Sequence, residues 1–459
     1  MDGRRKNQIE EKILLLVTGG LLVALIVLTV FLTKAFTSSS DEISGGFDMS
    51  TITSDETEYV DVSDVFLPEF IGITAKGKRV GVSSEIVAED IFGTLSPTVA
   101  YILSKSDGET VGEDEWDSLT GLDSSAYIRF HSQMPERVVR YFCAGCPEDY
   151  DVSGETAYIY EMFVIPFSRV DDSVRMYTRS LDGTVLRYTV TEPETYISSA
   201  ELDTLTEAYV SGLTEFAFAG NSFDSLLYTE PVFTENVKMP NLIITKGTAQ
   251  FIYDSVSGVK KVIGEFGMNP DKISESGDED DSSVGYIDSR GAFYVRDSAF
   301  EYRAASDGVE ISSFAGYSEN GDYSIEDYIR AAVILYKNVR ALDRNFAGAD
   351  AGCVLTSVSA KNGRVTVELS YTVDNTMIKG MPPALYCVFE NGFMKEASLY
   401  TVAVRERNDS TVLIPETAFA AHISKYGTAV YNASLCYRAD YISESVKAEW
   451  TADYKTEEN

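Results

Sequence analysis

The chain has 459 residues, and its 72 acidic residues outnumber its 38 basic residues, which gives a formal charge of −34 at neutral pH. So acidic a protein is repelled by phosphate backbones, and nucleic acid is therefore not an expected partner. Hydrophobic residues make up 44% of the chain, which is enough for packed cores and argues against extensive disorder. The length exceeds what one hydrophobic core usually supports, so we expect two or three domains.

An apolar run lies near the N-terminus, where twenty uncharged and mostly aliphatic residues extend from Ile13 to Leu32. As an α-helix this run is about 30 Å long, which matches the hydrocarbon core of a bilayer. Four basic residues precede the run and Lys34 alone follows it closely, so the N-terminus is expected in the cytoplasm. The sequence therefore predicts a cytoplasmic tail over 1–12, a single-pass transmembrane helix over 13–33 and an extracytoplasmic C-terminal body.

A cleaved secretory signal is the alternative explanation of this run. Such a signal has an apolar region of about 7–15 residues and ends at a cleavage site with small residues. The longer run here is followed by Thr33, Lys34 and Ala35, a poor cleavage site, so we expect the helix to be retained. Within the helix, Gly20 and Ala24 form a small-xxx-small pair, which makes them a candidate helix–helix contact. Glycine and alanine are common residues, so chance spacing is the alternative explanation.

Changes in composition divide the rest of the chain. Residues 34–59 are rich in Ser, Thr, Asp, Glu and Gly, and they predict a flexible stalk. Beyond the stalk we expect an N-terminal α+β ectodomain over 60–230, a central α+β module over 231–320 and a C-terminal helix-on-sheet module over 321–459. The acidic run Asp278–Asp281 offers carboxylates that suit calcium, but the EF-hand spacing is absent, so a solvated loop is the favoured interpretation.

Alternating β-branched and aromatic residues after Tyr127 predict strands. The clearest hairpin joins a strand ending at Arg179 to one that begins at Val185, because Asp182-Gly183 favours the φ > 0 turn that matches strand twist. The same turn signal recurs at Asp307-Gly308, Asn362-Gly363 and Asn391-Gly392. We therefore expect antiparallel sheets that pair strands adjacent in the sequence.

Two helices are expected to begin after capping serines, Ser84 and Ser324. Apolar residues then repeat at helical spacing from Ile325 to Tyr336, and this stripe should pack on a sheet. The strands expected after that helix are Val354–Ala360, Arg364–Val373, Ala384–Glu390 and Phe393–Val404. A short helix from Pro415 to Gly427 and two strands, Ala429–Cys436 and Val446–Tyr454, should complete the chain. The predicted fold class is α+β, with helices packed on antiparallel sheets.

Five cysteines are few for a secreted scaffold held together by disulfides. Cys143 and Cys146 have C-x-x-C spacing and form a possible disulfide, with two reduced thiols, a redox pair and half of a zinc site as the alternatives. No second C-x-x-C pair occurs and the chain has only two histidines, so we predict no metal site and no redox role. The other cysteines, Cys353, Cys387 and Cys436, lie in or beside apolar segments and are expected in the core.

The common catalytic motifs are missing from the sequence. It has no G-x-S-x-G, H-E-x-x-H, Walker or G-x-G-x-x-G pattern. His131 and His422 lie near aromatic residues and are interpreted as partly buried packing residues. Tyr160, Phe163 and Tyr177 could line a glycan-binding platform, but core packing is the favoured interpretation. We therefore predict a protein without enzyme activity or cofactor, and a hydrolase that uses an acidic pair is the alternative.

Several short motifs resemble one family of membrane-anchored proteins. They are Val65–Glu69, Ser124–Phe130, Phe266–Lys272, Gly285–Asp288 and Phe300–Tyr302. The order of helix, four strands, helix and two strands at the C-terminal end is also similar to modules of that family. The chain resembles YycH, also called WalH, and its sister YycI, the membrane-anchored regulators of the WalK sensor histidine kinase in low-GC Gram-positive bacteria.

The resemblance implies an N-terminal α+β domain followed by smaller modules similar to PepSY or cystatin-like folds. It also implies a non-catalytic regulator of cell-wall homeostasis. Such a protein contacts a sensor histidine kinase, and a sister YycI-like protein, through its transmembrane helix and ectodomain. The residues themselves leave a second function open, an anchored ectodomain that binds an envelope peptide or glycan with the span as a passive tether.

Overall fold

The computed structural model describes residues 62–82, 84–146, 157–209, 212–220, 230–246, 256–277, 284–296, 298–315, 323–342, 351–426, 430–439 and 445–454. The chain divides into two compact units, residues 1–58 and 59–459, and all described residues belong to the second unit. The predicted cytoplasmic tail, transmembrane helix and stalk, including Gly20 and Ala24, lie outside the described residues. The acidic run Asp278–Asp281 and Gly427 lie outside them as well.

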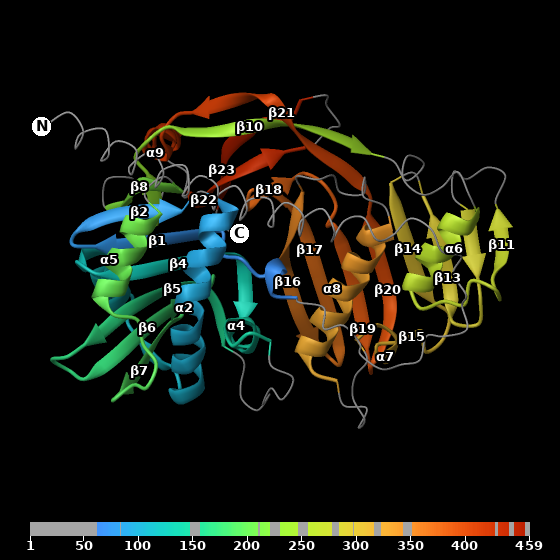
Figure 1. The fold of residues 1–459 in the computed structure, drawn as a ribbon, viewed down its shortest axis with the longest axis horizontal. Helices are drawn as coiled ribbons and strands as arrows, with labels where there is room; N and C mark the ends of the chain where they lie inside the picture. The colour runs from blue at the N-terminus through green and yellow to red at the C-terminus, as the bar shows by residue number, and fades with distance from the viewer. Residues whose placement is uncertain are drawn as a thin grey trace, which may run out of the picture. The chain divides into compact units, whose positions relative to one another are not determined.

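Nine of the described strands form the first sheet, in the order β3-β7-β6-β5-β4-β1-β2-β8-β9 (Figure 1). Its strands are β1 (Phe70–Ala75), β2 (Lys78–Val82), β3 (Glu109–Val111), β4 (Ser125–Pro135), β5 (Tyr158–Ser168), β6 (Ser173–Arg179), β7 (Val185–Thr191), β8 (Leu213–Phe218) and β9 (Pro231–Phe233). The helices in this part of the chain are α2 (Glu85–Lys105), α3 (Glu113–Ser118), α4 (Glu136–Cys143) and α5 (Ser199–Ala208). Every neighbouring pair of strands is antiparallel, as predicted.

Helix α2 packs on this sheet and contacts β1, β6 and β7. Its residues Ile91, Leu95 and Val99 recur one turn apart and are fully buried, which is the pattern of a helix with one stripe against a sheet. Among the described helices, α2 is long and apolar enough to cross a membrane by length and composition. Half of its apolar window is buried inside the fold, so we interpret α2 as a core helix of the body.

The start of α2 differs from the prediction. Ser84 occupies the N-cap position, but its side chain makes no capping hydrogen bond. The backbone N–H of Glu85 instead donates to Oδ1 of Asp374 at 2.7 Å. The cap therefore comes from a residue 289 positions away, which no local pattern at Ser84 reveals.

Twelve of the described strands form a second sheet, in the order β11-β12-β13-β14-β20-β19-β17-β18-β22-β23, with β15 beside β20 and β16 beside β17. Its strands are β11 (Ser274–Gly277), β12 (Val284–Ile287), β13 (Gly291–Val295), β14 (Ala299–Ala304), β15 (Val309–Glu310), β16 (Gly352–Lys361), β17 (Arg364–Val373), β18 (Thr376–Lys379), β19 (Leu385–Glu390), β20 (Phe393–Tyr400), β22 (Val430–Arg438) and β23 (Ala448–Tyr454). The helices in this part are α6 (Val256–Glu265), α7 (Ser312–Ala315), α8 (Ile325–Leu342) and α9 (Glu416–Ile423).

Helix α8 confirms the prediction made from its apolar stripe. It lies against β17 and β19 (Figure 1), and Ile329, Val333 and Tyr336 are buried there. Its first turn is capped as predicted, because Ser324 Oγ accepts a hydrogen bond from the N–H of Asp327 at 3.3 Å. Asp327 Oδ2 in turn accepts one from the N–H of Ser324 at 2.7 Å. Two backbone donors that the helix leaves unpaired are thereby satisfied.

The predicted hairpin turns are confirmed at Asp182-Gly183, Asn362-Gly363 and Asn391-Gly392. The hairpin predicted at Asp307-Gly308 is wrong, because β14 and β15 on either side of it both pair with β20 and not with each other. Gly183, Gly308, Gly363 and Gly392 have φ between +75° and +91°, a region that glycine enters without a Cβ clash. The β6–β7 hairpin pairs Arg179 with Val185, as expected for a strand pair joined by Asp182-Gly183. The fold class predicted from these signals, α+β with helices on antiparallel sheets, is therefore confirmed for the described body.

Two predictions about strands are wrong. The run predicted as the single strand Phe393–Val404 breaks at Thr401, and β21 (Val402–Leu413) leaves the sheet to form a two-stranded ribbon with β10 (Val237–Lys246). Strand β18 was not predicted, and it pairs in parallel with β22 rather than with an adjacent antiparallel strand. Both features are set by long-range pairing, which local alternation of side chains does not encode.

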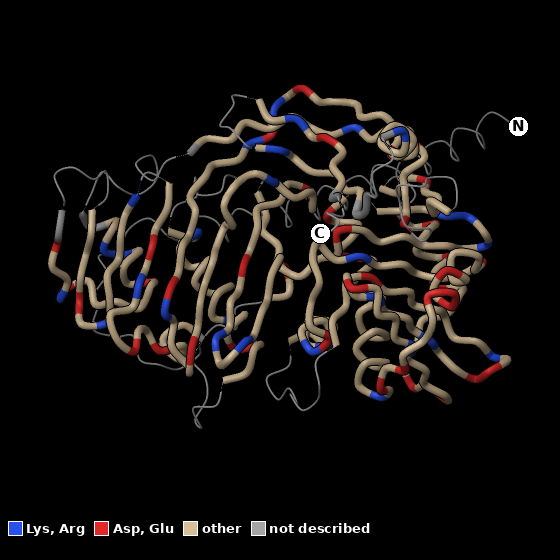
Figure 2. The backbone as a smooth tube through the Cα atoms, turned by 180° about the vertical axis from the view of Figure 1, so that it is seen from behind, with Lys and Arg blue, Asp and Glu red and all other residues tan. Residues whose placement is uncertain are grey.

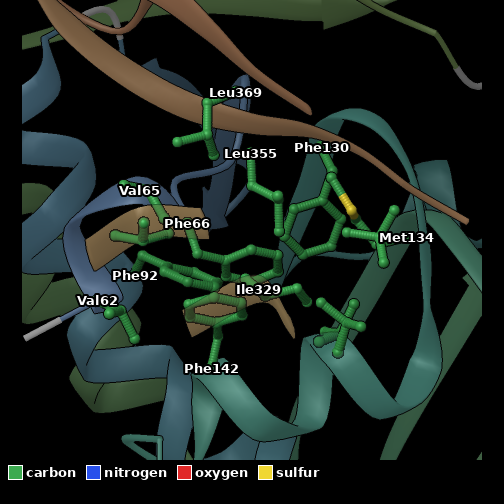
Figure 3. Close-up of a cluster of buried hydrophobic side chains, with 14 of the residues drawn as sticks. Val62, Val65, Phe66, Phe92, Phe130, Met134, Phe142, Ile329, Leu355 and Leu369 are labelled. Atoms are coloured by element: carbon green, nitrogen blue, oxygen red, sulfur yellow. The ribbon is translucent and has the colours of Figure 1, made fainter. Parts of the chain in front are cut away.

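The two sheets share one core rather than two. Phe66, just before β1, stacks on Phe142 of α4 with ring centroids 4.5 Å apart. Ile329 of α8 and Leu355 of β16 lie in the same buried cluster (Figure 3). Strands from both 231–320 and 321–459 also join in the second sheet. The boundaries predicted for these modules stay a proposal.

Candidate functional site

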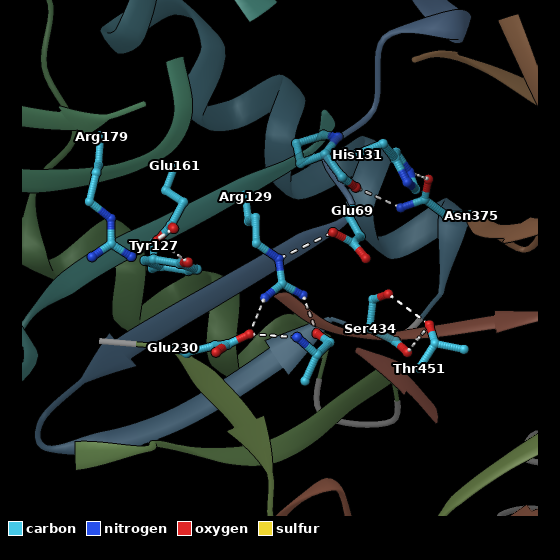
Figure 4. Close-up of polar contacts among 12 residues, drawn as sticks. Glu69, Tyr127, Arg129, His131, Glu161, Arg179, Glu230, Asn375, Ser434 and Thr451 are labelled. Atoms are coloured by element: carbon cyan, nitrogen blue, oxygen red, sulfur yellow. Dashed lines mark hydrogen bonds and ion pairs between the residues drawn. The ribbon is translucent and has the colours of Figure 1, made fainter. Parts of the chain in front are cut away.

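A buried ionic network lies where the first sheet meets the C-terminal strands (Figure 4). Its centre is Arg129 of β4, a residue only 5% exposed. Arg129 Nε donates to Oε2 of Glu69 at 3.2 Å, and its Nη1 lies 3.9 Å from Oε1 of Glu230. Its Nη2 donates to the carbonyl oxygen of Ala433 in β22 at 3.3 Å. One guanidinium group thus connects both carboxylates with a strand of the second sheet.

Glu230 strengthens the same junction from the other side. Its Oε1 accepts a hydrogen bond from the backbone N–H of Ala433 at 2.6 Å. Ala433 is therefore held at both its N–H and its carbonyl oxygen by side chains of the N-terminal part. Burial alone would lower the pKa of Arg129, but the negative field of the network, with Glu69 as its largest contributor, raises the pKa.

A second buried pair lies next to this centre on the same sheet. Arg179 Nη2 donates to Oε1 of Glu161 at 2.7 Å, and the hydroxyl of Tyr127 donates to Oε2 of Glu161 at 2.6 Å. Both oxygens of this carboxylate are thus used. Arg179 also lies over the ring of Trp116 at 4.9 Å, a favourable cation–π geometry. This pair stabilises the sheet and leaves no obvious group for chemistry.

His131 links the first sheet to the β17–β18 turn. Its Nε2 lies 3.1 Å from Oδ1 of Asn375, whose Nδ2 donates to the carbonyl oxygen of Pro68 at 2.7 Å. Burial lowers the pKa of His131, so the neutral imidazole is favoured and Nε2–H is the donor to Asn375. The histidine serves as a connector, in agreement with the predicted packing role.

Glu416, the first residue of α9, completes the junction. Its Oε2 accepts a hydrogen bond from the backbone N–H of Phe233 at 3.0 Å, and its side chain is buried. Burial raises the pKa of this carboxyl to about 8, and the neighbouring Glu230 and Glu69 add to the rise, although Phe233 and Arg129 oppose it. Glu416 is therefore mostly protonated at neutral pH.

The junction encloses only a small cavity, of about 60 Å³, lined by Glu69, Arg129, Asn375 and Glu416 among others. That volume suits one or two water molecules, whereas sites for small organic ligands span about 300–1,000 Å³. Across the described residues, no group of three or more His, Cys, Asp or Glu side chains is arranged to hold a metal ion. The arrangement is therefore suited to joining two parts of the body.

A larger hollow of about 690 Å³ lies at the hairpin ends of the second sheet, and we call it the hairpin groove. It is open to solvent and lies between the start of α8 and the β16–β17 and β19–β20 turns. Its lining consists of Arg137, Tyr323, Ser324, Ile325, Tyr328, Ala360, Lys361, Asn362, Gly363, Arg364, Val365, Asn391 and Gly392. Sequence patterns did not single out this groove, because its residues come from four separate segments.

The predicted cysteine pair lies at the end of α4. Cys143 and Cys146 are buried, and no disulfide joins them in the structure. Burial raises the pKa of the Cys143 thiol to about 12, which disfavours the reactive thiolate. The possible disulfide between the two residues stays a prediction.

Two other predictions can be compared with the structure. Tyr160, Phe163 and Tyr177 are at most 5% exposed, so they are core residues, as favoured, and do not form a glycan platform. His422 is exposed on α9, so the prediction of a partly buried packing residue is wrong for this histidine. The short helix turns its Ala420 and Ile423 inward instead.

Sequence reasoning missed Glu416 and Asn375. Glu416 follows Pro415 at a helix start, where an acidic residue is ordinarily a surface residue favoured by the helix dipole. Asp374-Asn375 is itself a turn signal, and both residues have positive φ. The sequence therefore indicates a turn at Asp374-Asn375. It does not indicate the contacts that these two side chains make with the N-terminal part of the chain.

Comparison with known proteins adds a structural likeness. No family model matches the sequence, and no curated protein matches it. The crystal structure of YycH from Bacillus subtilis aligns over 86% of this chain and 95% of YycH, with a TM-score of 0.53 and 11% sequence identity. The chain shares the fold of YycH. The predicted resemblance is thus confirmed at the level of fold.

Proposed function

We propose that the chain is a non-catalytic, membrane-anchored regulator of a two-component sensor histidine kinase that controls cell-wall homeostasis. The observation that carries the proposal is the extent of the likeness to YycH, which covers 86% of this chain and 95% of that structure. A likeness of this extent involves the whole order of modules rather than one common motif. The motifs from Val65 to Tyr302 that resemble the YycH and YycI family support it independently.

The predicted topology supports the same proposal. A transmembrane helix over 13–33 with a cytoplasmic N-terminus would place the body outside the cell membrane, where the negative charge keeps it soluble. The span would pack against a transmembrane helix of the kinase, and a sister YycI-like protein would be a further partner. The buried network around Arg129 would let the body respond to an envelope signal as one unit, because it ties the first sheet to the C-terminal strands.

Exchange of the span tests the role of the transmembrane helix. The segment from Ile13 to Leu32 is replaced by an unrelated apolar helix of equal length, and kinase-dependent transcription is measured in cells that lack the native protein. We expect regulation to be lost while the amount of protein in the membrane is unchanged. Full regulation by the exchanged protein would rule out transmission through the span.

A finer variant locates the contact. Gly20→Leu with Ala24→Leu blocks close helix approach, whereas Leu22→Ile with Ile26→Leu conserves size on another face and serves as the matched control. We expect the first pair of substitutions to abolish regulation and the second pair to preserve it. Equal activity of both variants would remove Gly20 and Ala24 from the proposed contact.

A further inference from the structure

The described lining of the hairpin groove has basic side chains, in contrast to the acidic composition of the chain. Among the described residues, its lining includes Arg137, Lys361 and Arg364 and no carboxylate. This contrasts with the whole protein, in which acidic residues outnumber basic residues by 72 to 38. Figure 2 shows acidic and basic residues interspersed along the backbone, so a ligand-sized hollow whose described lining has basic residues and no acidic ones is a local departure from that pattern.

The carboxylates next to the groove already have partners. Glu326 receives two hydrogen bonds from Arg137, at 2.8 and 2.7 Å, and is buried beneath the groove. Glu396 pairs with Arg364 at 3.1 Å in an exposed contact. Within the described part of the chain Lys361 has no ion-pair partner, and it is exposed. An anion in the groove would therefore meet Lys361 directly and would compete with Glu396 for Arg364.

Distance limits the effect of the other negative charges. Interactions between exposed charges are largely screened beyond about 8 Å at physiological ionic strength. A ligand in the groove therefore senses the nearby charges of Lys361, Arg364 and Glu396 more strongly than the distributed charge of the body, whereas Glu326 neutralises Arg137. An adjoining hollow of about 620 Å³ extends from Arg364 toward Arg303 and Lys395, with Glu390 and Glu396 also in its lining.

The neutral part of the lining favours a peptide. Ile325 and Val365 supply apolar contacts, and the ring of Tyr323 packs beside Gly392. The side-chain amides of Asn362 and Asn391 lie at the two exposed turns, where they can both donate to and accept from a peptide backbone. A polymer of phosphates would use the cations but would gain nothing from the apolar residues. The combination matches an extended segment with alternating acidic and apolar side chains.

We propose that the hairpin groove binds an acidic, extended peptide segment of a partner protein. Lys361 and Arg364 pair with its carboxylates, whereas Arg137 stays bound to Glu326 beneath the groove. This inference concerns a groove in the body and does not rest on the transmembrane contact proposed above. The span variants and the groove variants can therefore fail independently.

Binding is measured by fluorescence anisotropy with the full-length chain in micelles of a neutral detergent. The probe is a labelled octapeptide that alternates glutamate with alanine, and a glutamine–alanine octapeptide is the matched neutral probe. The test variant is Lys361→Gln with Arg364→Gln. The control variant, Lys76→Gln with Arg175→Gln, makes the same change in net charge at two partly or fully exposed residues of the first sheet. A thermal melt of each variant verifies folding.

We expect saturable binding of the acidic peptide, about tenfold weaker binding by the groove variant and unchanged binding by the control variant. Equal affinity for the glutamine peptide, or equal weakening in both variants, would overturn the proposal. Inorganic polyphosphate is tested as a competitor. If polyphosphate binds the wild-type chain and the acidic peptide does not, the groove is a phosphate-polymer site and the peptide assignment is wrong.

Discussion

Glu416 is a buried carboxylic acid whose proton affects stability. Burial raises the pKa of its carboxyl to about 8, whereas an exposed glutamate has a pKa of about 4.3. At pH values between these two pKa values, the Glu416 carboxyl is therefore protonated in the folded chain and ionised in the unfolded chain. This contribution to stability is fully present at low pH and is lost as pH rises through about 8, with a slope near 1.4 kcal/mol per pH unit between the two values.

Glu416→Gln isolates this effect, because the amide is neutral at every pH and keeps an oxygen to accept from Phe233. As the pH rises from 5.5 to 7.5, we expect the free energy of unfolding of the wild type to fall by about 2–3 kcal/mol more than that of the variant. Urea unfolding followed by the two tryptophans, Trp116 and Trp450, measures it. Glu109→Gln, at a largely exposed residue, is the control. An unchanged difference between wild type and Glu416→Gln over this pH range would contradict the assignment.

Arg129 forms ion pairs with the Glu69 and Glu230 carboxylates, at 3.2 and 3.9 Å. Arg129→Met removes this partner from the buried Glu230 and the half-buried Glu69, and such a loss costs about 3–5 kcal/mol. Arg175→Met is a matched change in β6, where an exposed pair with Asp171 should cost less than about 1 kcal/mol. Urea unfolding measures the loss of stability in each of the two variants. Similar losses for the two variants would mean that the network does not hold the junction.

At the scale of elements, the start of α2 depends on a side chain of the second sheet. Asp374→Ala removes the acceptor for the N–H of Glu85 and should cost about 1 kcal/mol, as for other lost helix caps. Asp374→Asn keeps an acceptor and tolerates the positive φ, so it should cost less. Ser84→Ala should be nearly neutral, because Ser84 makes no capping bond. Chemical denaturation of the three variants checks the order, and a larger loss for Ser84→Ala would reverse our assignment of the cap.

The predictability of the elements follows from the range of the forces that form them. Turns such as Asp182-Gly183 and the cap at Ser324 were predictable, because both depend on residues within a few positions. Strand β21 was not, since its alternation continues that of β20 and only pairing with β10 separates them. The cap that Asp374 provides for α2 was not predictable either, because Asp374 is far from α2 in the sequence. Local chemistry specifies elements, whereas their partners depend on the folded chain.

At the scale of the whole molecule, the sequence predicted the class and order of elements but not the junction. Arg129 and Glu416 are 287 positions apart in the sequence. The local sequence around Arg129 predicts a strand, and the local sequence around Glu416 predicts the start of a helix. Their meeting requires the C-terminal strands to return to the first sheet, as they do at Ala433. The candidate site was therefore beyond local patterns, whereas the resemblance to YycH predicted the architecture that contains it.

The most direct test of the proposed function is site-specific crosslinking of the full-length chain in its native membrane. Photoreactive residues are placed one at a time from Ile13 to Leu32, and the captured molecules are identified by mass spectrometry. We predict capture of a sensor histidine kinase's transmembrane helix, with a period of about 3.6 residues along the span. Capture of lipid alone at every position would contradict the account and would leave the span as a tether for the body.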